Sequence, residues 1–131
     1  MTHRRISILF VFALVAATAI VSASALARGG GDRRVVKNGT CSGNSTSKLK
    51  AKADDGRIEV EFEVDQNRSG VRWRVRLRHD GDLFAKTSRR THGRSGSFSI
   101  ERRVRNRAGS DRITAFARRA SGETCRASLR F

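Results

Sequence analysis

The stretch that decides the fold runs from Arg57 to His79 and reads R-I-E-V-E-F-E-V-D-Q-N-R-S-G-V-R-W-R-V-R-L-R-H. Apolar and charged residues alternate strictly in residues 57–65 and again in residues 71–79. A period of two is typical of β-strands that bury one face and expose the other. The exposed face is acidic in the first run and rich in arginine in the second. The stretch therefore predicts two half-buried strands of an all-β domain.

A third alternating run, residues 48–53, comes just before and is joined to the acidic strand through Asp55-Gly56. Asp-Gly between alternating runs favours a two-residue hairpin turn, because both turn positions need positive φ. The turn fixes which residues lie opposite each other, and it sets lysines against glutamates. The predicted pairs are Lys52–Glu59, Lys50–Glu61, Lys48–Glu63, Leu49–Phe62 and Ala51–Val60. Such pairs favour one register, because a slip of one residue would bury a row of charge.

The sequence leaves open which strand lies beside the arginine-rich run. Direct pairing with the acidic strand around residues 67–70 would set Asp65 against Arg72 and Glu63 against Arg74. A standard sandwich instead places these two strands in different sheets. In that case the row of arginines would have no acidic strand beside it.

Residues 1–27 have the pattern of a secretory signal peptide. Arg4 and Arg5 form the positive start, residues 6–21 are apolar and uncharged, and Ala25-Leu26-Ala27 is a small-x-small cleavage site. The alternative is a retained membrane anchor, but the apolar run is shorter than the roughly 20 residues that a spanning helix needs. The sequence therefore predicts a secreted, extracellular protein, with attachment to the cell envelope as a variant of that location.

Removal of the signal would leave 104 of the 131 residues, the size of one small domain. Residues 28–38 begin Arg-Gly-Gly-Gly and predict a flexible basic tether, and residues 39–131 predict the domain itself. No run after the signal is long and apolar enough to predict a further membrane span.

The two cysteines, Cys41 and Cys125, predict one disulfide bond. In an oxidising compartment, two cysteines of a small secreted domain most simply pair with each other. A redox or metal-binding pair is the alternative, but the chain has no C-x-x-C motif and no cluster of histidines near either cysteine. The bridge would stabilise a domain that has few large apolar residues.

Further strands follow the arginine-rich run. Asp80-Gly81 predicts a second two-residue hairpin turn, which would put Leu77 opposite Phe84. For the strand at residues 112–119 the sequence leaves open whether Ile113 or Phe116 points inward. Together the alternating runs predict about seven strands in a single small antiparallel β-sandwich.

The run of strands resembles an immunoglobulin-like or fibronectin-III-like sandwich, and Trp73 with Val75 and Leu77 on a third strand fits that resemblance. The bridge departs from it, because Cys41 and Cys125 would tie the start of the domain to the last strand, whereas true immunoglobulin domains join the second and sixth strands. The mature chain also resembles small secreted bacterial proteins of unassigned function. Neither resemblance supplies catalytic or binding residues.

No constellation of residues predicts an enzyme, a cofactor site or a metal site. His79 continues the apolar face of its strand, where a partly buried, hydrogen-bonded histidine is expected, and His92 lies in a Gly/Arg loop. The glutamates of residues 59–63 are expected to stay ionised beside basic strands, so none is poised as a general acid. The pairs Asp54-Asp55 and Asp80-x-Asp82 offer carboxylates for Ca²⁺, but aspartate is favoured in turns for local reasons.

The remaining indication of function in the sequence is its positive charge. Loss of Arg4 and Arg5 with the signal lowers the formal net charge from +16 to +14, and 21 of the 26 remaining basic residues are arginines. Arginine binds phosphate and carboxylate groups through two parallel hydrogen bonds. The candidate polyanion-binding residues are Arg72, Arg74, Arg76, Arg78, Lys86, Arg126 and Arg130.

Two functions follow from these observations. The first interpretation is a structural or protein-interaction module of the cell exterior, in which the charge is incidental. The alternative is an electrostatic binding module for extracellular polyanions such as envelope polymers, DNA or acidic glycans. Aromatic residues that could stack on bases are few, which argues against dedicated single-strand recognition.

Overall fold

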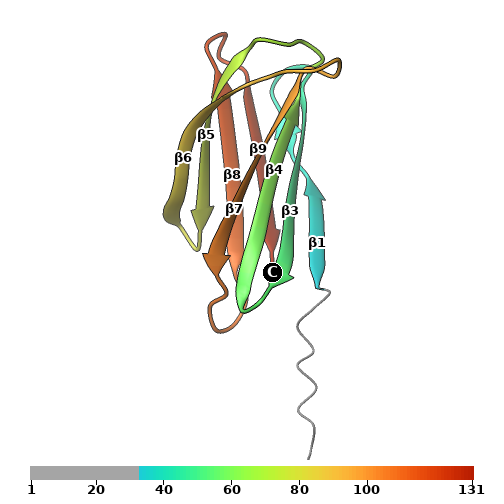
Figure 1. Ribbon diagram of the computed structural model, residues 1–131. Coiled ribbons are helices and arrows are strands. Elements are labelled where there is room, and N and C mark those ends of the chain that lie inside the picture. Colours follow the sequence, from blue (N-terminus) through green and yellow to red (C-terminus); the bar gives the residue numbers. More distant parts are fainter. Residues whose placement is uncertain (1–32) are drawn as a thin grey trace, which may run out of the picture.

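Two antiparallel sheets enclose one apolar core in residues 33–131, the part of the chain that this computed structural model describes (Figure 1). The first sheet has the order β1 (Arg34–Asn38), β3 (Thr46–Asp54), β4 (Arg57–Asp65) and β7 (Ser97–Arg105). The second sheet has the order β2 (Thr40–Cys41), β9 (Thr124–Arg130), β8 (Arg112–Arg119), β5 (Arg72–His79) and β6 (Asp82–Arg90). The prediction of an all-β sandwich is confirmed.

The chain before Arg33 lies outside the described residues, and the predicted signal peptide falls there. Within residues 33–131 no helix combines the length and the apolar character needed to cross a membrane. The predicted tether at 28–38 is wrong for residues 34–38, because these form β1 and pair with β3 from Arg34–Lys52 to Asn38–Lys48. Backbone pairing along an edge of the first sheet orders this segment.

The hairpin of β3 and β4 has the predicted register. Asp55 and Gly56 form the turn with φ angles of 44° and 75°. Both angles are positive, as a two-residue turn that matches the twist of the strands requires. All five predicted pairs are present, including Lys52 opposite Glu59 and Leu49 opposite Phe62.

The strands β4 and β5 lie in different sheets, so the pairing of Glu63 with Arg74 does not form. The inward face of β4 is apolar, that of β5 is apolar except for His79 at its end, and the sandwich buries both faces between the sheets. Asn67 and Gly70 take positive φ values of 60° and 82°, which lets the chain cross between the sheets. The side chain of Gln66 lies at this crossing and accepts a hydrogen bond of 2.9 Å from Trp73 Nε1.

The hairpin of β5 and β6 differs from the prediction in register. Asp80-Gly81 forms the expected two-residue turn, but Leu77 lies opposite Ala85 and not opposite Phe84. A β-bulge between Leu77 and Arg78 inserts Phe84 as an extra residue. Without the bulge, Lys86 would face the core. With it, Ala85 is buried and Lys86 lies on the outer surface beside Arg76.

The core consists of the inward residues of both sheets. Trp73 is completely buried, and its ring lies 6.3 Å from the ring of Phe98, between centroids. The sequence left open whether Ile113 or Phe116 of β8 points inward. Ile113 is buried in the core, and Phe116 lies on the outer side of the sheet. The predicted disulfide between Cys41 and Cys125 is present and joins β2 to β9.

Candidate functional site

The outer face of the second sheet gathers the basic residues that the sequence singled out. In β5 the residues Trp73, Val75, Leu77 and His79 are buried, so the alternate positions face solvent and are exposed. Residues directly opposite each other in an antiparallel sheet project from the same face. Lys86 on β6 lies opposite Arg76, and Phe116 on β8 lies between Arg76 and Arg126 of β9. All seven predicted residues therefore project from one face.

Sequence reasoning missed three further arginines on this face. Arg118 lies opposite Arg74, Arg112 lies opposite Arg130, and Arg90 lies opposite Arg72. The only signal for the two on β8 was the alternation of residues 112–119, whose phase the sequence did not fix. We call the whole set the arginine face, and its members are Arg72, Arg74, Arg76, Arg78, Lys86, Arg90, Arg112, Arg118, Arg126 and Arg130.

The arginine face has no acidic neighbours on its central strands. The sequences of β5, β8 and β9 contain no Asp or Glu. Within residues 33–131 every ion pair with a lysine or arginine uses a residue outside the arginine face, namely Lys50, Arg103, Arg107 or Arg119. The charge of this face is thus left to solvent and to ligands.

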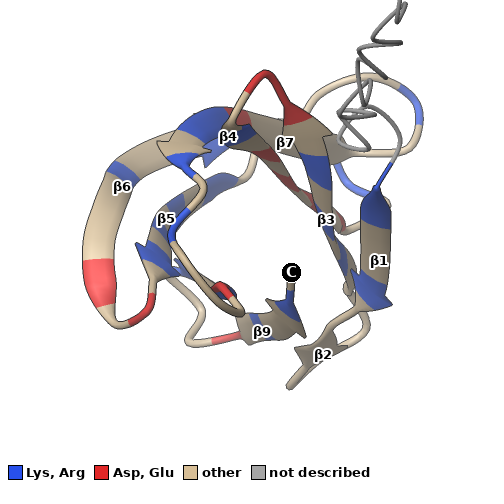
Figure 2. Ribbon diagram, turned by 90° about the horizontal axis from the view of Figure 1, so that it is seen from below, with Lys and Arg blue, Asp and Glu red and all other residues tan. Residues whose placement is uncertain are grey.

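The outer face of the first sheet is different, because acidic and basic residues alternate across its strands. Lys50 Nζ lies 3.0 Å from Glu61 Oε1, and Arg103 Nε lies 2.9 Å from Asp54 Oδ2. Figure 2 shows the two sheets curving around the core, with β4 and β7 on one side of the molecule and β5 and β9 on another. The sandwich therefore separates the acidic strand β4 from the arginine face.

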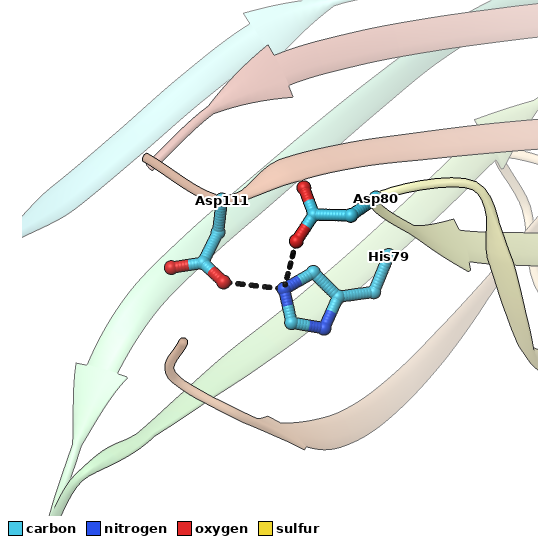
Figure 3. Close-up of side chains that lie close together, drawn as sticks. All are labelled: His79, Asp80 and Asp111. Carbon is cyan, nitrogen blue, oxygen red and sulfur yellow. Dashed lines mark hydrogen bonds and ion pairs between the residues drawn. The ribbon is translucent and has the colours of Figure 1, made fainter. Parts of the chain in front are cut away.

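A polar cluster lies at the end of β5, where His79, Asp80 and Asp111 meet (Figure 3). His79 and Asp111 are buried, and His79 Nε2 contacts Asp111 Oδ1 and lies 3.3 Å from Asp80 Oδ2. These three ligand atoms lie within 4.8 Å of one another, as in a metal site. The second oxygen of Asp111 is buried without a partner in residues 33–131, but it points away from the other two residues (Figure 3).

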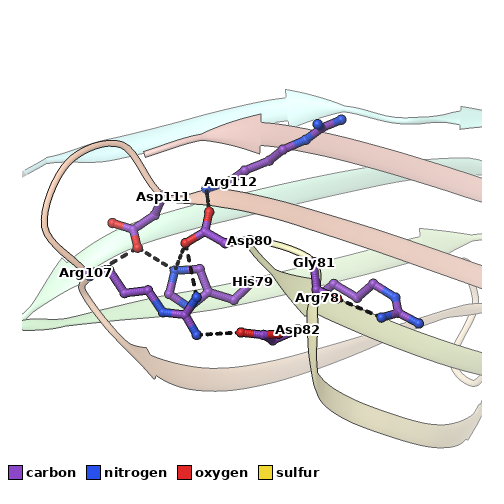
Figure 4. Close-up of polar contacts among 8 residues, drawn as sticks. All are labelled: Arg78, His79, Asp80, Gly81, Asp82, Arg107, Asp111 and Arg112. Atoms are coloured by element: carbon purple, nitrogen blue, oxygen red, sulfur yellow. Dashed lines mark hydrogen bonds and ion pairs between the residues drawn. The ribbon is translucent and has the colours of Figure 1, made fainter.

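The carboxylates of this cluster already have donors. The backbone N–H of Arg107 donates to Asp111 Oδ1 at 3.1 Å, and that of Arg112 donates to Asp80 Oδ1 at 2.7 Å. The guanidinium of Arg107 lies 3.4 Å from Asp80 and 3.0 Å from Asp82 (Figure 4). The Arg112 hydrogen bond lowers the pKa of Asp80, against weaker desolvation. A cation beside Arg107 would meet repulsion, so we assign the cluster a structural role that ties β8 to the end of β5.

A second buried carboxylate holds the loop before β3 against the turn between β8 and β9. Glu123 accepts a hydrogen bond of 3.0 Å from the Ser45 backbone N–H and one of 2.7 Å from Arg119 Nε. Desolvation raises the pKa of Glu123, but the hydrogen bonds from Ser45 and the charge and hydrogen bond of Arg119 outweigh it, so the net shift is downward. The ionised form is therefore the one that stabilises the fold.

This contact predicts acid sensitivity. A carboxylate with a lowered folded-state pKa contributes stability above its usual value of 4.5 and loses that contribution as the pH falls through the lowered pKa. The free energy of unfolding, measured with urea between pH 6 and pH 2.5, should therefore fall less for Glu123→Gln than for the wild type. Glu101→Gln, an exposed change on β7, is the control. Parallel pH curves for Glu123→Gln and the wild type would contradict the assignment.

Neither a protein-family model nor a curated protein nor a solved structure matches this chain. The arginine face brings ten cations from four strands of the second sheet together. His92 is exposed in the loop between β6 and β7, and its backbone pairs with Ser97. The disulfide takes up both cysteines.

Proposed function

We propose that this protein is an extracellular binding module for extended polyanions, which it holds by charge and not by sequence through the arginine face. The observation that carries the proposal is the absence of acidic residues from β5, β8 and β9, together with the location of β4 in the other sheet. This favours the second of the two functions derived from the sequence over a structural or protein-interaction module.

The spacing of the face supports a linear polymer. Successive outward residues on a strand lie about 6.6–6.8 Å apart, and neighbouring strands lie about 4.8 Å apart. Four arginines of β5 thus form a row about 20 Å long, flanked by cations on β6 and β8. Guanidinium groups bind carboxylate and phosphate in the same bidentate geometry. A chain of anionic groups can therefore contact several arginines at once.

Two features support the proposed location and fold family. The Cys41–Cys125 bridge supports an extracellular location, because structural disulfides persist in oxidising compartments. The predicted signal peptide supports the same location.

We also propose that the fold is related to immunoglobulin-like sandwiches, a relation supported by the buried Trp73 on a central strand of the second sheet. We propose no catalytic activity.

The test is a salt series with a charge-matched control. Arg74→Ser/Arg76→Ser should weaken binding to polyphosphate and to an anionic glycan by on the order of tenfold at 50 mM salt, and should make the plot of log affinity against log salt shallower by about 1.5. Lys48→Ser/Lys52→Ser removes the same charge from the outer face of the first sheet and should change both quantities much less.

Two results would count against the proposal. An equal loss in the two variants would show that net charge acts without a defined face. Unchanged affinity and slope in Arg74→Ser/Arg76→Ser would remove the arginine face from consideration. Binding to a single protein partner with little dependence on salt would instead favour the structural or protein-interaction module.

A further inference from the structure

A groove of about 720 Å³ crosses the arginine face. Its floor is formed by short side chains, since Thr114 of β8 lies opposite Ser128 of β9. One wall is the neighbouring row of longer side chains, Arg76, Phe116 and Arg126. The groove exists because the strand register aligns a row of small residues beside a row of large ones, so it runs across the strands.

The other side of the groove is also basic. Arg112 precedes Thr114 by two residues on β8 and projects from the same face, and Arg78 lies opposite Thr114 on β5. The hydroxyl of Thr40, opposite Arg126, adds a third hydroxyl group to the lining. Four arginines therefore surround a floor of neutral hydroxyl groups.

Phe116 is half-buried and supports one of these arginines. The guanidinium carbon of Arg126 lies 4.7 Å from the centroid of the Phe116 ring. Stacking on an aromatic ring holds the planar guanidinium in place and preserves its bidentate edge. It also covers that side of the ring. The face therefore lacks the free aromatic platform on which nucleic-acid bases stack.

The hydroxyl groups of the groove distinguish polyphosphate from a carboxylated sugar polymer as its ligand. The oxygens of polyphosphate only accept hydrogen bonds, so polyphosphate can use the donor capacity of Thr114 and Ser128 but leaves their acceptor capacity unused. A sugar with a carboxylate needs both kinds of partner, because its own hydroxyl groups donate as well as accept. The part of the Phe116 ring that Arg126 leaves uncovered would meet its C–H surface.

We infer that the groove is a subsite for the uronate units of a carboxylated polysaccharide. The arginines bind the carboxylate, the hydroxyl row on β8 and β9 bonds to the sugar hydroxyls, and the rest of the arginine face holds neighbouring units of the polymer. This inference rests on the proposed function and names its ligand class.

The test removes hydroxyl groups without changing charge. Thr114→Val/Ser128→Ala keeps the shape of the strand surface, and the control Ser88→Ala/Thr124→Val removes two hydroxyl groups from the same face outside the groove. We expect the first variant to bind polygalacturonate about tenfold more weakly, the effect of two neutral hydrogen bonds, with the salt slope unchanged. Binding to polyphosphate and to a poly-dT oligonucleotide should weaken less, and the control should match the wild type for all three polymers.

Several outcomes would overturn the inference. The inference is wrong if Thr114→Val/Ser128→Ala binds polygalacturonate as tightly as the wild type does. It is also wrong if this variant loses as much affinity for polyphosphate as for polygalacturonate. Tighter binding of the wild type to poly-dT than to polygalacturonate would assign the groove to nucleic acid. In each of these cases Arg74→Ser/Arg76→Ser can still lower affinity, so the proposed function survives. If the wild type shows no salt-dependent binding to any of the three polymers, both the proposed function and this inference are wrong. Equal thermal unfolding midpoints of variant and wild type would exclude misfolding as the cause.

Discussion

Replacing both Cys41 and Cys125 with serine should lower the free energy of unfolding by roughly 4–5 kcal/mol. The bridge spans 84 residues, so in the chain-entropy model it removes a large share of the freedom of the unfolded chain. The folded state also depends on it locally. The strand β2 has only two residues and pairs only with β9, at Thr40–Arg126 and Cys41–Cys125. Without the bridge, the connection from β1 to the second sheet is held by this short pairing and by the hydrogen bonds of Ser42 with Thr124 and of Ser45 with Glu123.

The loss should appear as a lower urea midpoint for the double variant than for the wild type, with the slope of the transition also compared. A control is the wild type after reduction, which should be destabilised by a similar amount. The arginines of β5 should remain in place in the folded variant, because β6 and β8 pair with that strand on both sides. Two free thiols in the denatured, unreduced protein, found by thiol titration, would contradict the bridge.

Local turn chemistry is the reason that the β3–β4 hairpin could be predicted to the residue. Asp55-Gly56 determines the turn, the turn determines the register, and the charge rows exclude a slip. The same reasoning failed at Phe84, because the bulge there is chosen by packing. It keeps Ala85 in the core and Lys86 in solvent, and nothing in the turn at Asp80-Gly81 indicates it.

The segment 34–38 could not be predicted as a strand for a different reason. Its two valines are not separated by polar residues, so no alternation marks it as a strand, and three of its five residues are basic or amide side chains. It is a strand because β3 offers an unpaired edge. The chain reaches this edge without a two-residue turn that the sequence would indicate, so local periodicity assigns the segment to a tether.

The arginine face was visible in part from the sequence. The row on β5 follows directly from the alternation around Trp73, but its freedom from acidic partners depends on which sheet contains β4. The contributions of Arg112 and Arg118 depend on the phase of β8, which changes with one residue of loop length. The groove requires the register of three strands at once, and only the folded sheet defines it.

Replacing Trp73 with alanine should cost roughly 3–5 kcal/mol of unfolding free energy. The side chain is completely buried in the cluster that also contains Val60, Phe62 and Val75, and it packs against Phe98 at 6.3 Å between ring centroids. Removal of the indole would leave a cavity between the two sheets. It would also leave Gln66 Oε1 without the donor at 2.9 Å that holds the crossing between β4 and β5.

A matched variant separates these two contributions. Trp73→Phe keeps most of the apolar volume but loses the indole N–H. Both variants lose the hydrogen bond to Gln66, so Trp73→Phe should cost less than Trp73→Ala by the contribution of the larger cavity. Because Trp73 is the only tryptophan of the chain, the fluorescence of the folded wild type reports this site alone. The emission should be shifted to the blue of hydrated indole and should move to the red on unfolding. Emission typical of hydrated indole before denaturant is added would mean that Trp73 faces solvent. The four arginines of β5 would then point into the core, where cations without acidic partners could not be accommodated.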